Sequence, residues 1–384
     1  MRTPKDWDQP CPNPACTHYS RKQQGNVSAI ATYLTQSGKR RIFRCHRCAT
    51  QFAETRETVF FDLRTPEDKV MMALKMLLVR VDLAGICFVL GVTEETVLGW
   101  LRRAAHQAEA LNRHLLRDLP VTQVQLDEMW NFIARKHACE TDAAGESLPN
   151  GEDGRQWVWV SFAPEFRLMI AAIVGPRTLD TAKEVVAATK ARVAGIPAFF
   201  SDGFTCSLAA LIAAFHVVTT CARTGKRGRP RKPRCEPHPD LVYGQLVKQK
   251  QQGKLLTLST RVVLGAERLT HLGLTISTAL VERVNLTLRQ ALAPLARKTS
   301  SFCKDRERLR QRVVFFQAFY NMARPHMSLR QPLPPQERTH HGAIRPRWRE
   351  HTPAIAAGVT DHVWTFRELL TAKFEPLDSQ SISG

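Results

Sequence analysis

Three acidic residues in three different sequence contexts are the strongest candidates for chemistry in this chain of 384 residues. Asp127 interrupts the strand-like run VTQVQLDEMWNFI, Asp202 follows the buried-strand pattern AFFS, and Glu282 lies near the start of the amphipathic pattern ALVERVNLTLRQAL. Each context would fix a carboxylate in space. Carboxylate oxygens are ligands that Mg²⁺ prefers, and a pair of such ions promotes in-line phosphoryl transfer.

An isolated Asp or Glu is usually a solvated surface group, and an Asp after a strand is commonly a turn residue. The combination of the three contexts nevertheless favours a shared site. Three clustered carboxylates without cations would repel one another and take up protons, so bound cations would complete the site. We therefore predict that Asp127, Asp202 and Glu282 bind two Mg²⁺ or Mn²⁺ ions.

The elements expected to position these acids alternate between strands and helices from about residue 120 to residue 330. Strand patterns run through Asp127 and through WVWVSF, RLMIAAIV and AFFSD, and a helical pattern covers residues 179–193. We predict an α/β fold in which a mixed sheet is flanked by helices. A polar insert around 139–155 and a basic insertion around 223–265 interrupt the pattern.

The helix that carries Glu282 has two predicted faces. An apolar stripe is formed by Val281, Val284, Leu288 and Leu292. Glu282, Asn285 and Arg289 fall on the adjoining face at spacings of three and four residues. We predict that Asn285 and Arg289 contact DNA beside the acid, whereas Arg283 fits an ordinary solvated face.

Two close pairs of cysteines lie near the N-terminus, in CPNPAC and CHRC, and are separated by the strand patterns SAIATYL and KRRIFRC. The four residues are Cys11, Cys16, Cys45 and Cys48. This is the spacing of a zinc ribbon, in which four thiolates hold one structural Zn²⁺ and a short segment folds around it. His18 and His46 are alternatives for one sulfur ligand, and incidental cysteines in a reduced protein are the competing interpretation. The remaining cysteines show no paired spacing and are expected to be core or surface thiols: Cys87, Cys139, Cys206, Cys221, Cys235 and Cys303.

A helical pattern follows, beginning with the helix-entry signal Thr-Pro in TPEDKVMMALKMLLVRV. LAGICFVLG then precedes VTEETVLGWLRRAA, with Gly91 expected at the turn and Thr93 at the cap of the second helix. This predicts a helix-turn-helix that presents Thr96, Arg102 and Arg103 to the DNA major groove. A plain helical hairpin that packs a linker would give a similar pattern.

The basic segment RTGKRGRPRKPR contains a Gly228-Arg229-Pro230 core that resembles the AT-hook, whose arginines enter a narrow minor groove. Its candidate DNA contacts are Arg227, Arg229 and Arg231. A solvated basic loop explains the charge equally well.

Composition agrees with a polyanionic partner, because 55 Lys and Arg residues against 35 Asp and Glu residues give a formal net charge of +20. The partner that we expect is double-stranded DNA. The chain has no apolar stretch long enough to span a bilayer, and MRTPKDWDQP lacks the apolar core of a signal peptide. We therefore expect a cytoplasmic, nucleoid-associated protein.

The chain resembles DDE transposases of bacterial insertion sequences, most closely the insertion-sequence-one family and its relatives. The resemblance runs from about Cys11 to Arg330 and is carried by LDEMW, WVWVSFAPEFRLMIAAIVGPR, SDGF, VERVNLTLRQALAPLARKTSSF and FYNMARPHMSLR. It implies that Asp127, Asp202 and Glu282 are the catalytic triad of an RNase H-like domain.

Four regions follow from these patterns and the resemblance. They are a zinc ribbon over 1–62, a helix-turn-helix over 63–119, an RNase H-like domain over 120–330 and a tail of unassigned role over 331–384.

The predicted function is DNA transposition by a homo-oligomer on DNA, with 3′-end hydrolysis at the element end followed by strand transfer. The alternatives are a noncatalytic DNA-binding regulator built on a transposase scaffold and a structure-selective nuclease that shares the metals.

Overall fold

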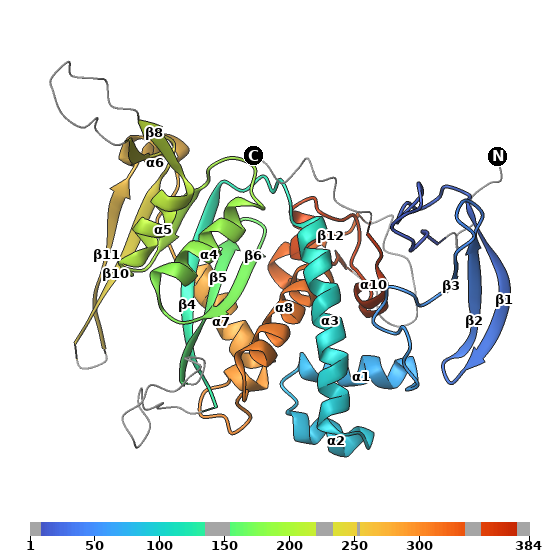
Figure 1. Cartoon of the computed structure of the whole chain (residues 1–384). Helices are drawn as coiled ribbons and strands as arrows, with labels where there is room; N and C mark the ends of the chain where they lie inside the picture. Colours follow the sequence, from blue (N-terminus) through green and yellow to red (C-terminus); the bar gives the residue numbers. More distant parts are fainter. Residues whose placement is uncertain (1–8, 135–153, 220–232, 252–253, 335–346, 375–384) are drawn as a thin grey trace, which may run out of the picture.

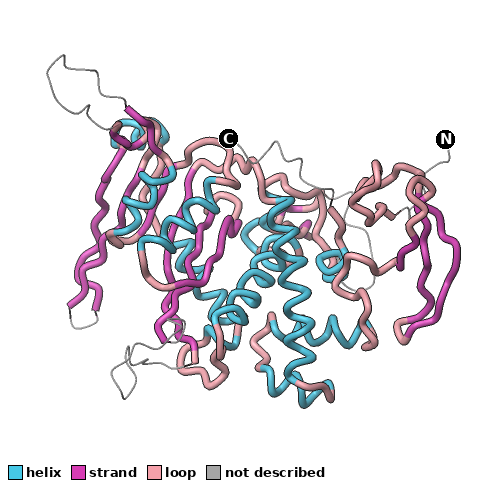
Figure 2. The backbone as a smooth tube through the Cα atoms, viewed as in Figure 1, coloured by secondary structure: helices cyan, strands magenta, loops and turns pink. Residues whose placement is uncertain are grey.

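The computed structural model describes residues 9–134, 154–219, 233–251, 254–334 and 347–374. Three regions follow one another along the chain: a small sheet that bears cysteines, a group of helices, and a mixed sheet with helices packed on it (Figures 1 and 2). Helices of the second region and helices that follow the mixed sheet pack together in the centre of the molecule.

The N-terminal sheet is antiparallel and has the strand order β1-β2-β3. Its strands are β1 (Val27–Thr35), β2 (Gly38–Cys45) and β3 (Gln51–Ala53). Its buried apolar cluster consists of Cys11, Cys16 and Cys45 together with Val27, Phe43 and Phe52. A core this small contributes little burial free energy, so a further stabilising group is expected here.

Three helices follow, and their ends match the expected capping residues. They are α1 (Glu67–Leu77), α2 (Leu83–Leu90) and α3 (Glu94–Leu115). Gly91 ends α2 in the left-handed region at φ 59°, and the Thr93 side chain accepts a hydrogen bond from the backbone N–H of Thr96. Within the described ranges, no single helix is long and apolar enough to cross a bilayer, and α2 and α3 meet that criterion only as a pair bent by 109°.

A six-stranded mixed sheet forms the third region, with the strand order β11-β10-β7-β4-β5-β6. Its strands are β4 (Gln123–Ile133), β5 (Gly154–Ala163), β6 (Leu168–Gly175), β7 (Ala198–Ser201), β10 (Tyr243–Gln251) and β11 (Lys254–Leu264). β4, β5 and β6 form an antiparallel meander, β7 pairs in parallel with both β4 and β10, and β11 pairs antiparallel with β10. The predicted α/β class and mixed sheet are confirmed.

The predicted basic insertion around 223–265 needs correction in its second half. β10 and β11 are members of the main sheet, and β11 forms its edge (Figure 1). Lys and Gln residues interrupt the apolar pattern of β10. Only its first three residues, Tyr243–Gln245, pair with β7, and Lys248 and Gln249 further along it are exposed.

Helices cover both faces of the sheet. The larger ones are α4 (Leu179–Lys190), α5 (Cys206–Ala214), α6 (Ala266–Leu272), α7 (Ala279–Ala291) and α8 (Arg306–Met322). The remaining short elements are β8 (His216–Thr219), β9 (Arg234–Pro237), η1 (Ala293–Leu295), η2 (Met327–Leu329), β12 (Gln331–Pro332), β13 (Trp348–Arg349), α9 (Pro353–Ala356) and α10 (Phe366–Thr371).

The strand register shows which face each helix covers. Thr189 of α4 donates a hydrogen bond to Ser161 at 2.7 Å, and Ser161 pairs with Leu126 across the β4–β5 ladder. Gln125 has the opposite orientation, and its side chain accepts from the backbone N–H of Val281 in α7 at 2.9 Å. Hence α4 and α7 lie on opposite faces of β4.

The C-terminal segment, residues 347–374, joins the N-terminal sheet region to the helices, and Figure 1 shows its helix α10, in red, beside α3. The carbonyl of Leu370 accepts from Val59 N at 3.1 Å. The carbonyls of Ala372 and Phe374 accept from Gln107 of α3 and from Ser20. A segment whose sequence suggested no role is therefore a structural connection.

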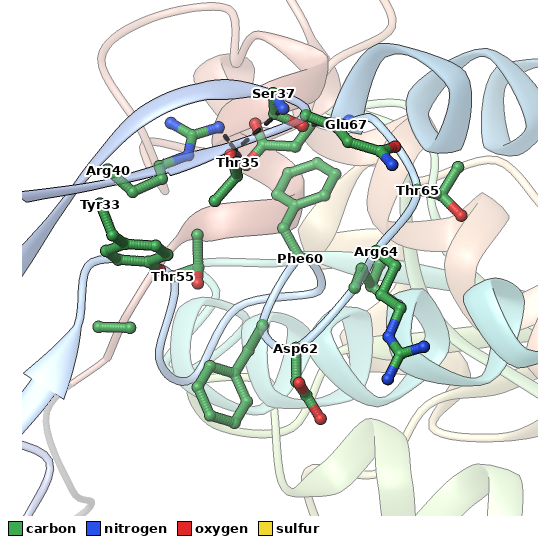
Figure 3. A pocket seen from close by; sticks show the side chains of 14 residues that line it. Tyr33, Thr35, Ser37, Arg40, Thr55, Phe60, Asp62, Arg64, Thr65 and Glu67 are labelled. Atoms are coloured by element: carbon green, nitrogen blue, oxygen red, sulfur yellow. Dashed lines mark hydrogen bonds and ion pairs between the residues drawn. The ribbon is translucent and has the colours of Figure 1, made fainter.

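Glu67 fixes the start of α1 against two other parts of the chain. Its side chain is 9% exposed and forms ion pairs with Arg40 of β2 and Arg367 of α10. Its backbone N–H donates to Ser37 Oγ at 2.8 Å. Figure 3 shows Arg40, Ser37 and Glu67 together at one side of a pocket of about 230 Å³ between the β1–β2 hairpin and α1.

Replacing Glu67 with Gln is expected to lower the free energy of unfolding by about 2 kcal/mol, because two guanidinium groups would then face a neutral amide at a buried position. Urea denaturation of the variant measures this loss. Glu184→Gln, at an exposed position of α4, is the matched control and should change stability by less than about 0.5 kcal/mol. Equal stabilities for both variants would contradict the role assigned to Glu67.

Candidate active site and cysteine cluster

Strand register brings Asp127 and Asp202 to the same level of the sheet. β4 and β7 are parallel, and Gln125 pairs with Phe200. Asp127 follows Gln125 by two residues, as Asp202 follows Phe200. The second acid therefore sits just past the end of β7, beside the first, at an edge where side chains of open α/β sheets commonly meet ligands.

A third carboxylate, which was not predicted from the sequence, completes this group. Asp127, Glu128 and Asp202 each offer a carboxylate oxygen, and these oxygens lie within 4.8 Å of one another. Glu128 neighbours Asp127 on β4 and points to the α4 face, where Arg177 contacts it. The Asp-Glu dipeptide in LDEMW is the available signal, but adjacent side chains of a strand point to opposite faces, so the dipeptide alone does not place both acids at one site.

Asp127 is fixed on the opposite face by Asn285 of α7, whose Nδ2 donates to Asp127 Oδ2 at 2.7 Å. Burial raises the pKa of Asp127 to about 6, with further upward contributions from the charges of Asp202 and Glu282, while the hydrogen bond from Asn285 opposes the rise. In the absence of cations this carboxyl therefore binds a proton more tightly than an exposed Asp does.

Glu128 has a charged partner, whereas the partner of Asp127 is a neutral amide. Arg177 donates to Glu128 Oε1 from Nε at 2.8 Å and also from Nη2. The guanidinium group also lies over the rings of Trp157, at 4.8 Å, and Phe204, at 4.4 Å, which hold it in place. Burial and the charge of Asp202 still raise the pKa of Glu128 to about 7, with Arg177 opposing the rise.

Glu282 lies beside this group but outside the cluster of three. Its Oε1 forms an ion pair with Lys248 of β10 and accepts a hydrogen bond from Thr278 Oγ1 at 2.9 Å. It is close enough for its charge to raise the pKa of Asp127. The structure thus brings Asp127 and Asp202 together and places Glu282 next to them, engaged with a lysine.

Asn285 and Arg289, the residues of α7 that were predicted to contact DNA, both have protein partners. Asn285 is buried and is occupied by Asp127. Arg289 donates from Nη1 to the carbonyl of Leu295 and from Nη2 to that of Trp130, both at 3.3 Å. Helical spacing correctly placed both residues on the face of α7 that carries polar side chains, and this face packs on β4. Both residues therefore position α7 and the acid that it carries.

Metal-free protein should lose stability as the pH rises through the pKa values of Asp127 and Glu128. Both groups bind protons more tightly when folded, so their stabilising contribution is complete below the unfolded pKa values near 4. It is lost as the pH rises from about 4 to about 7, about 6 kcal/mol for the two groups together. Urea unfolding in magnesium-free buffer measures this slope. Asp127→Asn should flatten it and Glu184→Gln should not, whereas parallel profiles for the wild type and Asp127→Asn would contradict the assignment.

The four predicted cysteines form a second cluster. The sulfur atoms of Cys11, Cys16, Cys45 and Cys48 lie within 4.8 Å of one another, and none is in a disulfide. The Cys11–Cys48 and Cys16–Cys45 sulfur distances are 3.5 and 3.9 Å. Four sulfurs at about 2.3 Å from a tetrahedral Zn²⁺ would be about 3.8 Å apart. The geometry therefore suits that metal, and neither His18 nor His46 belongs to the cluster.

Hydrogen bonds orient two of these thiols. Asn26 Nδ2 lies 3.1 Å from Cys45 Sγ, and Cys48 Sγ lies 3.3 Å from Thr50 Oγ1. The contacts with Thr50 lower the pKa of Cys48 to about 6, whereas burial raises the pKa of Cys11. A lowered thiol pKa favours the thiolate form that a metal requires.

The predicted DNA-contact residues of α3 differ in their surroundings. Arg102 is exposed and forms a 3.5 Å ion pair with Glu95. Arg103 is exposed but donates from Nη1 to the carbonyl of Phe61, and Thr96 is half-buried and hydrogen-bonded to Thr93. Arg102 is thus the freest of the three. Arg227, Arg229 and Arg231, with the Gly228-Arg229-Pro230 core, lie outside the described residues, and their roles stay predictions.

No protein-family model matches the chain, and no curated protein sequence matches it. Among solved structures, the "Crystal structure of the Mos1 Strand Transfer Complex" has 15% sequence identity and a TM-score of 0.15, covering 36% of this chain and 52% of that one. The "Mos1 transposase paired-end complex with left transposon end" has 15% identity and a TM-score of 0.15, covering 37% and 56%. The aligned part spans little more than half of those chains.

Proposed function

We propose that this chain is a DNA transposase that binds the ends of an insertion sequence and catalyses metal-dependent 3′-end hydrolysis and strand transfer. The observation that carries this proposal is the convergence of carboxylates from three separate elements: Asp127 on β4, Asp202 after β7, and Glu282 on α7. A mixed sheet with helices on both faces is also what the RNase H-like domain of the sequence resemblance requires.

The acidic residues fit hard divalent cations. Three carboxylate oxygens within 4.8 Å repel one another, and the raised pKa values of Asp127 and Glu128 record that repulsion together with burial. Bound Mg²⁺ or Mn²⁺ ions would supply Lewis-acid activation of the attacking oxygen and stabilisation of the leaving oxygen. Asp127 and Asp202 would hold the ions, with Glu128 and Glu282 on either side.

The surrounding residues would position the acids and the DNA. Asn285 holds the Asp127 carboxylate and Gln125 holds the start of α7, so the acids keep their relative places as DNA binds. Lys248, which pairs with Glu282, would contact a DNA phosphate. Away from this site, the cysteine cluster would hold one Zn²⁺ in a zinc ribbon, and α2 with α3 would form the helix-turn-helix that reads the element ends.

A noncatalytic DNA-binding regulator is the second candidate. The observation that favours it is the pairing of Glu282 with Lys248 and of Glu128 with Arg177, which would neutralise two of the acids in a scaffold that no longer reacts. In the transposase, DNA phosphates would compete for Lys248 and Arg177, and metal ions would compete for the two carboxylates.

Incubation with labelled candidate end duplexes, a target plasmid and Mg²⁺ separates these functions. A transposase produces nicks at the 3′ ends of the element and joins the freed ends to the plasmid. Binding without nicking would support the regulator and overturn the proposal. Cutting at unrelated duplexes without joining would instead identify a nuclease.

A further inference from the structure

A second polar pocket, of about 310 Å³, lies between the helix pair α2–α3 and the connection from α7 to α8. One wall consists of Asp82, Leu83 and Ala84 at the start of α2 together with Glu94 and Leu98 of α3. Residues of the α7–α8 connection and of α8 form the other wall, among them Ser300, Ser301, Cys303, Lys304, Arg308 and Arg312. Figure 1 shows α2 beside this connection.

Arg312 is the unusual residue of this pocket. Its side chain is 6% exposed, and its Nε and Nη1 atoms are buried without a hydrogen-bond partner among the described residues. The thiol of Cys303 contacts the guanidinium group, but burial raises the pKa of Cys303 to about 11, so the thiol stays neutral. A buried guanidinium with unsatisfied N–H groups is costly and calls for an acceptor.

Among the described residues, the other charged groups that line the pocket do not hydrogen-bond to Arg312. Arg308 is paired with Asp305 at 2.7 Å, and Asp82 Oδ1 accepts from the backbone N–H of Gly85 at 2.7 Å. Glu94 is exposed in the first turn of α3. Lys304 at the rim and Arg312 at the base therefore form the cationic part of the pocket, next to the hydroxyls of two serines.

We infer that this pocket binds a phosphate group, with Arg312 as its buried donor and Lys304 at its mouth. Guanidinium, ammonium and hydroxyl groups match the donors that phosphate oxygens accept from. The source of the phosphate rests on the proposed function: it is a backbone phosphodiester of DNA bound along α2 and the start of α3. Binding of DNA to α2 and α3 would then also contact the connection between α7, which carries Glu282, and α8.

Thermal unfolding in inorganic phosphate and duplex binding, both with the full chain, test the inference. Arg312→Met keeps the length of the side chain and removes its charge. In phosphate-free buffer the variant should be at least as stable as the wild type, since a buried unpartnered charge is gone. Phosphate should raise the Tm of the wild type only. Duplex affinity should fall by about 10- to 100-fold in the variant, and the salt dependence of binding should drop by about one charge.

Lys183→Met, at an exposed position of α4, is the charge-matched control and should bind duplex and respond to phosphate like the wild type. If Arg312→Met does not fold, Lys304→Met at the rim replaces it and should weaken duplex binding with the same loss of salt dependence. Phosphate stabilisation that requires Arg312, together with unchanged duplex affinity, would support a free-phosphate pocket and discard DNA as the source.

A wild-type protein that phosphate does not stabilise, with full duplex affinity in both pocket variants, would overturn the inference. These outcomes do not depend on strand cleavage. A chain that binds duplex through Arg312 but never cuts DNA would refute the proposed enzyme and leave the phosphate pocket standing.

Discussion

Replacing Asp127 or Asp202 with Asn is expected to reduce 3′-end nicking and strand joining by about a thousandfold or more, while duplex affinity stays within about threefold of the wild type. Each change removes a carboxylate from the cluster of three and removes no cationic DNA contact. Nicking and joining are followed on labelled end duplexes, and affinity is measured on the same duplexes by electrophoretic mobility shift.

Substitutions of the neighbouring acids Glu282 and Glu128 should reduce nicking and joining to different extents. Glu282→Gln should also abolish the reaction, because this residue is the remaining acid of the predicted triad. Glu128→Gln should have a smaller effect, because Arg177 already neutralises Glu128. Asp180→Asn, at an exposed position in the first turn of α4, is the matched control and should retain full activity. Full joining by any one of the three triad variants would refute its assignment as a metal ligand.

Cys45→Ser is the second change with a large expected effect, namely loss of the bound zinc together with recognition of element ends. Cys45 is fully buried, its Sγ lies 3.9 Å from that of Cys16, and the apolar cluster around it is small. Without the metal, this region should unfold, because structural zinc contributes much of the folding free energy of such segments. Elemental analysis should find about one Zn²⁺ per wild-type chain and almost none in the variant.

Cys235→Ser, at an exposed cysteine of β9, controls for the loss of any thiol and should keep the zinc. Folded wild-type protein that carries no zinc would rule the ribbon out. Zinc retained in Cys45→Ser would show that another residue can complete the ligand set.

The main strands and helices could be predicted because their patterns are local. The strand through Asp127 and the strand that ends before Asp202 appear as expected. So do the capped helices α2 and α3 and the apolar stripe of Val281, Val284 and Leu288. Parallel pairing of β4 with β7 then brings Asp127 and Asp202 together.

What the sequence did not reveal depends on contacts between distant segments. Lys248 contacts Glu282 from a strand that carries no motif, and nothing local to Arg177 indicates that it contacts Glu128. Asn285 and Arg289 lie on a polar helix face that packs on a strand, which spacing alone cannot distinguish from a face that contacts DNA. β10 escaped prediction because its exposed positions are basic and polar, although its first residues pair with β7.

Mn²⁺ binding to the DNA-free protein tests the proposed acidic metal site most directly, because it requires no knowledge of the element ends. Electron paramagnetic resonance reports the free ion as Mn²⁺ is titrated into zinc-loaded protein near pH 8, where Asp127 and Glu128 are largely deprotonated. Wild-type protein should bind Mn²⁺, and the double variant Asp127→Asn with Asp202→Asn should bind it at least about tenfold more weakly, while Asp180→Asn binds it normally. Equal Mn²⁺ binding by the wild type and the double variant would contradict the assignment of these acids to a metal site.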